Sequence, residues 1–258
     1  MNCDLSILPL KPLDIKDDSD KKYHPHLPSI ARNHGTCMLI LGAVASGKTC
    51  LLVNLLLSKH FFRDAFEKVY VFSPTAELDD SMRHMKEAFE VYSEYKDEIL
   101  EKIIAQQKKY PKDKMPKIAI VADDSMGLLT KKFYSFISRY RHINSNVFLS
   151  IQNFRALNPI ARTNANAICI MNGIYNDNEL AKIDEEYGSI YKNTLLYCYR
   201  KYAKKKYSFL YLKLRKNPPE MYLNFIEKIK WNLLKKKAKQ WNKNNLDSDT
   251  EEEDDDLE

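Results

Sequence analysis

GAVASGKT, residues 42–49, decides the fold of this chain, because it matches the pattern G-x-x-x-x-G-K-[ST] at every position. The glycines allow a tight loop whose backbone N–H groups surround phosphates, and the helix that follows points its positive end at the same anion. The Lys48 ammonium is expected to reach the β- and γ-phosphates, and the Thr49 hydroxyl to coordinate Mg²⁺. The sequence therefore predicts an ATP site formed by Gly42, Ala43, Val44, Ala45, Ser46, Gly47, Lys48 and Thr49.

A second motif, KIAIVADDS at residues 117–125, ends an apolar run in two acids. Parallel sheets place ligand chemistry at the carboxyl ends of their strands. Asp123 is therefore expected to hold Mg²⁺ through water, and Asp124 to polarise the attacking water. The alternative is that both acids cap the following helix. Many ATPases have glutamate at the second position, and the aspartate found here is one methylene shorter.

Short β-rich runs alternate with longer helical patterns over residues 35–215, which is typical of a parallel sheet covered on both faces. The run SFLYLKLR at 208–215 is expected to form an antiparallel partner of the strand before it. The predicted fold class is α/β with a central, mostly parallel sheet. The expected strands are 37–41, 68–73, 118–122, 146–151, 167–171 and 195–199, and the expected helices 48–59, about 78–109, 131–139 and 177–187.

The phosphate-binding loop 42–49 is of the type called a P-loop, and the order of the strands distinguishes two kinds of P-loop protein. Kinase-type proteins usually place the P-loop strand beside the strand that ends in the acid, whereas molecular motors insert another strand between them. The run NVFLSI at 146–151 is the candidate for an inserted strand. Gln152 follows it and is placed to sense the γ-phosphate or to orient the water. The alternative is a polar loop residue without a special role.

The segments outside this core differ in composition. Residues 1–34 are rich in Pro, Asp and Lys and predict an extended arm. After two prolines, apolar residues spaced four, three and four apart from Tyr222 to Leu233 predict a basic helix. The acidic end has nothing to bury and is expected to be disordered. The predicted divisions are the arm 1–34, the ATPase domain 35–215, the helix 216–243 and the tail 244–258.

Charge is segregated along the chain. Residues 247–258 carry nine of the 35 acids and no base, so the remaining body has 41 basic and 26 acidic residues, a net +15. Between Arg200 and Lys243 there are fifteen Lys or Arg and two acids. A positive field of this kind usually faces a polyanion, and a solvated lysine-rich surface is the alternative. The aromatic residues interleaved with these lysines, Tyr207 among them, are interpreted as core rather than as stacking platforms.

Composition excludes several classes. Hydrophobic residues make up 44% and charged residues 29%, as in globular proteins. The apolar runs are shorter than the roughly 18 residues of a membrane helix, and the N-terminus has no secretory pattern. We therefore expect a soluble protein that is not secreted. Buried free thiols in a reducing compartment are expected for Cys3, Cys37, Cys50, Cys169 and Cys198, which form no CxxC pair.

Five motifs follow one another along the chain: GAVASGKT, IAIVADD, RYRH at 139–142, the strand ending SIQN, and NPIARTNA at 158–165. In this order they resemble the FtsK–HerA superfamily, and within it the poxvirus-type genome-packaging ATPases of large DNA viruses and virophages. The resemblance covers about residues 36–173, and the remainder more weakly.

The resemblance implies a RecA-like fold of the ASCE type and ring-shaped homo-oligomers, commonly hexamers. It also implies ATP-driven movement of double-stranded DNA into a preformed capsid, with ATP and Mg²⁺ as cofactors. The implied partners are double-stranded DNA, bound without sequence preference, and capsid or membrane components of the virion. The implied location is the virion or the viral factory in the host cytoplasm. By the same resemblance Lys48 and Thr49 form the phosphate-binding pair, Asp123 and Asp124 the acidic pair, and Gln152 the glutamine of the next strand.

The resemblance further calls for an arginine that reaches the nucleotide of a neighbouring subunit, where a cation neutralises charge on the transferred phosphoryl group. Arg141, just before the strand 146–151, is the first candidate, Arg162 the second and Arg155 the third. An ordinary surface arginine or ion pair is the alternative at each position, and the sequence does not separate them.

Other functions stay open beside a packaging motor. They are a cellular-type DNA pump or helicase, and a nucleotide-gated scaffold that binds a capsid protein without motor activity. Helicases of the large superfamilies have additional ordered motifs that are not found here. A nucleoside kinase would need a lid and base-recognition motifs. ATPase activity measured with and without double-stranded DNA separates most of these functions.

Overall fold

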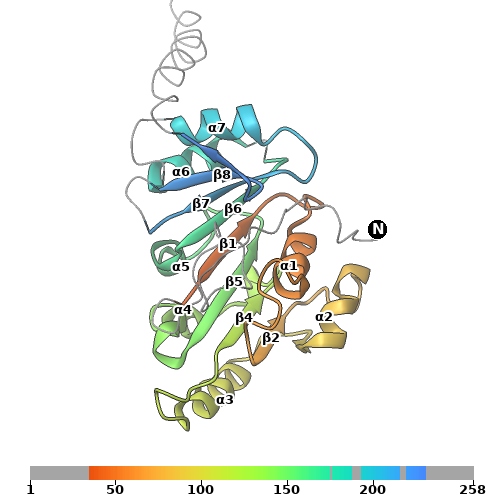
Figure 1. Ribbon diagram of the computed structural model, residues 1–258, viewed down its shortest axis with the longest axis vertical. Coiled ribbons are helices and arrows are strands. Elements are labelled where there is room, and N and C mark those ends of the chain that lie inside the picture. Colours follow the sequence, from red (N-terminus) through yellow and green to blue (C-terminus); the bar gives the residue numbers. More distant parts are fainter. Residues whose placement is uncertain (1–34, 175, 188–192, 216–218, 231–258) are drawn as a thin grey trace, which may run out of the picture.

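One sheet runs through the described part of the chain, which in this computed structural model comprises residues 35–174, 176–187, 193–215 and 219–230 (Figure 1). Within these ranges the sheet has nine strands in the order β3-β2-β4-β5-β1-β6-β7-β8-β9. All strand pairs from β3 to β6 are parallel, and β7, β8 and β9 continue the sheet in antiparallel pairs. The predicted α/β fold with a mostly parallel sheet is confirmed.

The strands are β1 (Cys37–Leu41), β2 (Lys68–Phe72), β3 (Glu90–Tyr92), β4 (Ile118–Ala122), β5 (Ser145–Ile151), β6 (Ala167–Met171), β7 (Phe209–Lys213), β8 (Glu220–Leu223) and β9 (Glu227–Ile229). The helices are α1 (Lys48–Leu57), α2 (Arg83–Ala88), α3 (Asp97–Lys108), α4 (Lys131–Ile137), α5 (Pro159–Asn164), α6 (Asp177–Tyr187) and α7 (Thr194–Tyr202). Short helical turns are η1 (Asp80–Met82), η2 (Met126–Leu128) and η3 (Tyr140–Ile143).

The P-loop strand β1 lies between β5 and β6, with Leu39 opposite Leu149 on one side and opposite Ile168 on the other. β4, which leads into the acidic pair, is the next strand beyond β5. The strand 146–151 is therefore inserted between the other two, as predicted for molecular motors. Every residue of β1, β4, β5 and β6 is buried, which explains why β1, β4 and β6 are apolar throughout rather than alternating. β5 also buries three polar residues, Ser145, Asn146 and Ser150.

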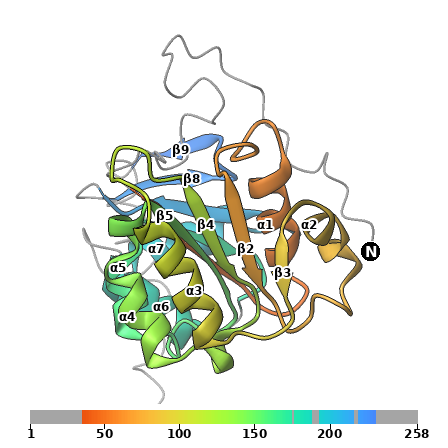
Figure 2. The same ribbon diagram turned by 90° about the horizontal axis from the view of Figure 1, so that it is seen from below.

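Helices cover both faces of the sheet unequally (Figure 2). On one face α1 and α2 pack on the side chains of Met38, Ile40 and Val71. On the other face α3 to α7 pack on Leu39, Ile120 and neighbouring strand residues. α1 therefore starts at the end of β1 and runs back along its own face of the sheet, which places the loop between them at the carboxyl edge of the parallel strands.

At the opposite end of the parallel strands, where they begin, the carbonyl of Gly35 links several segments by hydrogen bonds. Gly35 lies just before β1. It accepts hydrogen bonds from the hydroxyl of Tyr140 (2.8 Å), the side-chain amide of Asn166 (2.8 Å) and the guanidinium of Arg215 (2.9 Å). The side-chain oxygen of Asn146 accepts the N–H of Thr36 at 2.7 Å. These polar groups satisfy the backbone where the buried strands begin, and they fix β1 relative to its neighbours.

The prediction of a strand at 195–199 is wrong, because these residues lie in helix α7. The carboxylate of Asp184, on α6, accepts the backbone N–H groups of Asn193 and Leu195, both at 2.7 Å. This contact satisfies N–H groups at the start of α7 that have no partner within the helix. The run 208–215 does pair antiparallel, as predicted, but its partner is β6 rather than 195–199.

The prediction of a basic helix over 216–243 is wrong for residues 219–230, where the chain forms the antiparallel pair of β8 and β9. Asn224 and Phe225, in the loop between them, both have positive φ, 50° and 65°. The Phe225 ring lies 4.7 Å from those of Phe209 and Tyr211 and 5.8 Å from that of Phe61, measured between centroids. This packing holds the loop, and the rest of the predicted helix lies outside the described residues.

The predicted helix over about 78–109 is interrupted. The chain forms η1, α2, the strand β3 and then α3, and β3 adds to the sheet edge in parallel to β2. The predicted arm 1–34 and tail 244–258 lie outside the described residues. Among the residues that are described, no helix has the length and apolar character of a membrane span.

The cysteines follow the prediction in part. Cys37, Cys169 and Cys198 are free and buried, as expected. Cys50 is instead in a disulfide bond, so the prediction of a free thiol is wrong for this residue. Cys3 lies outside the described residues.

Candidate functional site

The loop 42–49 is hydrogen-bonded at both ends. Two of its residues have positive φ, and its first glycine has no room for a side chain. The N–H of Gly42 donates to the carbonyl of Ile151 at 3.1 Å, and helix α1 begins with the N–H of Leu51 donating to Gly47 at 2.9 Å. Ala45 and Gly47 have positive φ, 58° and 93°. A Cβ added to Gly42 would lie 2.3 Å from the Ser46 hydroxyl oxygen, so the first glycine of the motif is required by space.

The start of α1 offers its N–H groups to a ligand. The helix has no side-chain cap at its N-terminus and no acid in its first turn. Its first N–H groups therefore keep free hydrogen-bonding capacity at the positive end of the helix dipole. The Ser46 hydroxyl, buried in the same loop, has no hydrogen-bond partner among the described residues. The arrangement suits the oxygens of a phosphate chain.

Lys48 is 5% exposed and its Nζ donates to the carbonyl of Ala43 at 2.9 Å, across the loop. Burial lowers the pKa of the Lys48 ammonium, and the nearby carboxylates of Asp124 and Asp123 act in the opposite direction. The cation is therefore held inside the loop by one neutral acceptor and two acids. A phosphate group in the loop would give it a stronger partner than the carbonyl does.

Thr49 and Asp123 are brought together as predicted: the Thr49 hydroxyl donates to Oδ2 of Asp123 at 3.1 Å. Asp123 is fully buried, and burial raises the pKa of its carboxyl group, as does Asp124. The Ser150 and Thr49 hydroxyls and Lys48 lower it. The other oxygen, Oδ1, has no hydrogen-bond partner among the described residues. A buried carboxylate oxygen without a partner beside a hydroxyl fits a magnesium site, because Mg²⁺ prefers hard oxygen ligands.

No group of three or more His, Cys, Asp or Glu side chains in the described ranges could hold a metal ion by itself. Mg²⁺ is usually held by one or two protein oxygens, with the rest of its ligands from water and the substrate phosphates.

Asp124 and Gln152 also meet, although they are 28 residues apart in the chain. The side-chain amide of Gln152 donates to Oδ1 of Asp124 at 3.0 Å. Asp124 has a positive φ of 46°, a conformation that is uncommon for residues other than glycine. The backbone therefore turns sharply after Asp123, so one acid is buried beside Thr49 while the other faces the end of β5.

The three candidate arginines lie in different surroundings. Arg141 is exposed and belongs to η3, before β5, at the edge of the sheet opposite the loop 42–49. The Arg162 side chain is 12% exposed, and its Nε lies 3.4 Å from Oε1 of Glu186. Arg155 is exposed in the segment after Gln152, at the same edge as the acids. Arg162 is thus already paired within its own chain, whereas the other two side chains are exposed.

Sequence reasoning missed two neighbours of the site. Ser150 has a buried hydroxyl close enough to Asp123 to lower the pKa of its carboxyl group, and a lone hydroxyl in an otherwise apolar run was the available signal. Tyr207, which had been interpreted as core, packs against Gly47. A Cβ added to Gly47 would lie 2.9 Å from Cδ1 of Tyr207. The sequence carries no signal for this contact, because it joins residues 160 positions apart.

The sequence that forms this site matches a known protein family. The family model described as Poxvirus A32 protein matches residues 30–197. The chain belongs to the Poxvirus A32 protein family. The resemblance to the poxvirus-type family is thereby confirmed. Among curated proteins, none matches the chain.

Solved structures show the same fold as this member of the Poxvirus A32 protein family. The genome packaging NTPase B204 from Sulfolobus turreted icosahedral virus 2, in complex with sulfate, is 17% identical with a TM-score of 0.50, covering 73% of this chain and 95% of that chain. Its complex with AMPPCP is 16% identical with a TM-score of 0.51, covering 73% and 96%. B204, the DNA-packaging ATPase from Sulfolobus Turreted Icosahedral Virus, is 18% identical with a TM-score of 0.50, covering 72% and 95%.

Proposed function

We propose that this chain is a packaging ATPase that binds Mg-ATP in the loop 42–49, hydrolyses it to ADP and phosphate, and uses the energy to move double-stranded DNA into a viral capsid. The observation that carries the proposal is the meeting of Lys48, Thr49 and the acids Asp123 and Asp124 around one loop, in a member of the Poxvirus A32 protein family. The structures of B204 with AMPPCP and sulfate support nucleotide binding by this fold.

Each side chain has a distinct task in this proposal. Lys48 exchanges its bond to the Ala43 carbonyl for the β- and γ-phosphates. Thr49 and Asp123 hold Mg²⁺, which supplies charge neutralisation on the phosphates. Asp124 accepts a proton from the attacking water, and the amide of Gln152, already bonded to Asp124, orients that water.

DNA binding is assigned to the lysine-rich stretch that begins at Arg200. Lys204, Lys205 and Lys206 are consecutive and exposed, and they belong to the stretch from Arg200 that carries fifteen basic residues and two acids. Lysine–phosphate contacts give affinity without reading sequence, which suits a motor that must move along any DNA. The chain would act as a homo-oligomeric ring in the virion or viral factory, in contact with capsid or membrane components of the virion.

DNA should stimulate hydrolysis. We expect ATP turnover by the full chain to rise several-fold when double-stranded DNA is added, because a translocase couples the two activities. A coupled assay of phosphate release at low salt measures this, with heparin as the control polyanion and Lys48→Ala protein as the background. Stimulation should weaken as salt rises, since phosphate contacts release counterions. Turnover that is the same with and without DNA would favour a nucleotide-gated scaffold over a motor.

Mixing experiments should identify the arginine that acts on the neighbouring subunit. Arg141→Ala is expected to leave nucleotide affinity nearly unchanged and to lower hydrolysis in the assembled ring. Adding Lys48→Ala subunits should then restore part of the activity. Each Lys48→Ala subunit still has Arg141, which can act on the intact loop 42–49 of a neighbouring Arg141→Ala subunit. Arg155→Ala and Arg162→Ala serve as matched comparisons, and recovery with either of these instead of Arg141→Ala would move the assignment.

A further inference from the structure

Tyr207 ends a tightly fastened loop between α7 and β7. The carbonyl of Lys205 accepts the N–H and the hydroxyl of Ser208, at 2.9 and 2.6 Å. The backbone N–H of Asn172, just after β6, donates to the carbonyl of Ser208 at 2.8 Å, and its side-chain amide donates to the carbonyl of Ala203. Contacts on both sides of the lysines therefore fasten the loop to the end of β6.

Tyr207 itself adopts a conformation that needs outside support. Its φ is 65°, which is unusual for a large side chain. The ring edge lies over Gly47, and the Lys206 ammonium lies 4.9 Å from the ring centre, within the range of a cation–π contact. The residue is only partly buried. Backbone strain of this kind often marks a functional position.

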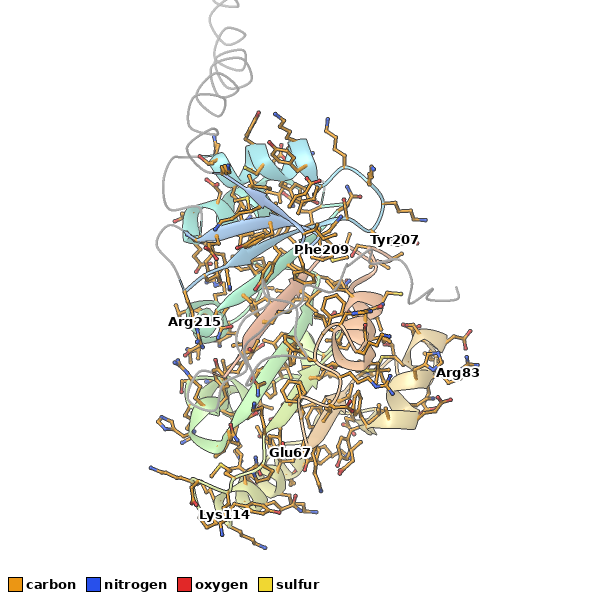
Figure 3. The ribbon with its side chains drawn as sticks, in the orientation of Figure 1. Glu67, Arg83, Lys114, Tyr207, Phe209 and Arg215 are labelled. Carbon is orange, nitrogen blue, oxygen red and sulfur yellow. The ribbon has the colours of Figure 1, made fainter. Side chains whose placement is uncertain are left out.

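Strand order tells which end of a nucleotide would lie near Tyr207. On one side of β1 come β5 and β4, which end at Gln152 and Asp123. These residues mark the end of the loop that receives the terminal phosphate. The nucleoside is attached to the other end of the triphosphate, so it must leave the loop on the side of β6 and β7. Figure 3 shows Tyr207 beside the loop that leads into α1, whereas Arg215 lies at the far end of β7.

We propose that Tyr207 is the platform on which the base of the bound nucleotide stacks, with Gly47 against the edge of its ring. Met171, the last residue of β6, lies 3.7 Å through its Cε from a Cβ added to Gly47. Gly47 is therefore required twice, by its φ of 93° and because any side chain there would displace the ring. An aromatic face accepts every base, with purines favoured by their larger area. The inference rests on the proposed function, since it needs a nucleotide in the loop.

The test compares a ligand that has a base with one that lacks it. Binding of ATP and of inorganic tripolyphosphate, both with Mg²⁺, is measured by calorimetry on the full chain and on Tyr207→Leu, which keeps bulk over Gly47 but loses the aromatic face. We expect ATP to bind about tenfold more weakly, within the range for loss of base–aromatic stacking, and tripolyphosphate to bind as before. Tyr207→Phe should behave like the original chain.

Tyr202→Leu is the matched control, because Tyr202 is also a partly buried tyrosine with a lysine ammonium, that of Lys201, 5.3 Å from its ring centre. Its ATP affinity should not change. Equal losses of affinity for ATP and tripolyphosphate in Tyr207→Leu would mean that the ring only supports the loop. This result would overturn the inference but not the proposed function. No loss for either ligand would overturn it as well. If the original chain binds neither ligand, the proposed function fails, and this inference with it.

Discussion

Replacing Lys48 by alanine should reduce ATP turnover by at least about a hundredfold, the scale on which loss of one positioned group at a transition state is felt. The side chain is buried inside the loop and its ammonium lies close to both acids. Without it, the β- and γ-phosphates would bring their charge to the carboxylates of Asp123 and Asp124 with no protein cation between them. Nucleotide binding should therefore weaken strongly, together with hydrolysis.

Phosphate release and equilibrium binding of ATP measure this result. Lys59→Ala is the matched control, because Lys59 is an exposed lysine two residues beyond the end of α1. The variant should fold, since alanine favours the helix and the carbonyl of Ala43 loses only one of its donors. Near-normal hydrolysis by correctly folded Lys48→Ala protein would remove the basis of the proposed function.

Substitutions of Asp124 and Asp123 should have different effects on ATP binding and hydrolysis. Asp124→Asn should bind Mg-ATP almost normally but hydrolyse it about a hundredfold more slowly, as expected when a general base is lost. An asparagine side-chain oxygen can still accept the amide of Gln152, so the geometry of the pair is retained while the proton acceptor is removed. Single-turnover measurements of hydrolysis, with binding measured separately, give both values.

Asp123→Asn should instead weaken the dependence of ATP binding on Mg²⁺, because Asp123 is the buried partner of Thr49 and its Oδ1 has no other described partner. Binding measured over a range of Mg²⁺ concentrations tests this expectation. Equal and mild effects of Asp123→Asn and Asp124→Asn would show that the roles of the two acids have been assigned wrongly.

The centre of the fold was predictable because its signals are local. A strand that enters a glycine-bounded loop and a helix that leaves it are adjacent in sequence, so GAVASGKT places β1 and α1 together. The run before Asp123 is apolar throughout and the run before Gln152 is largely apolar, as expected of strands buried on both faces. The pairing of Gln152 with Asp124 follows once these two strands are neighbours, and Thr49 reaches Asp123 from the start of α1 although β5 lies between β1 and β4.

The outer parts were not predictable because distant contacts decide them. Residues 195–199 are a short apolar run that fits a strand or a helix equally well. The carboxylate of Asp184, on the preceding helix α6, satisfies the N–H groups that a helix there leaves free. The spacing from Tyr222 to Ile229 fits a helix, yet Phe225 is held at positive φ by the rings of Phe61, Phe209 and Tyr211. No rule of turn composition points to phenylalanine at such a position.

The antiparallel extension limits how the protein can be divided for experiments. The family match ends at residue 197, within α7, but β6 is paired along its whole length with β7, from Ala167 opposite Lys213 to Met171 opposite Phe209. A fragment ending at the family boundary would expose the backbone of β6 and the apolar surface beneath it. Exposed edges of this kind pair with other chains and aggregate. The shortest well-behaved fragment therefore has to keep β7 and β8, although the phosphate loop lies far earlier in the sequence.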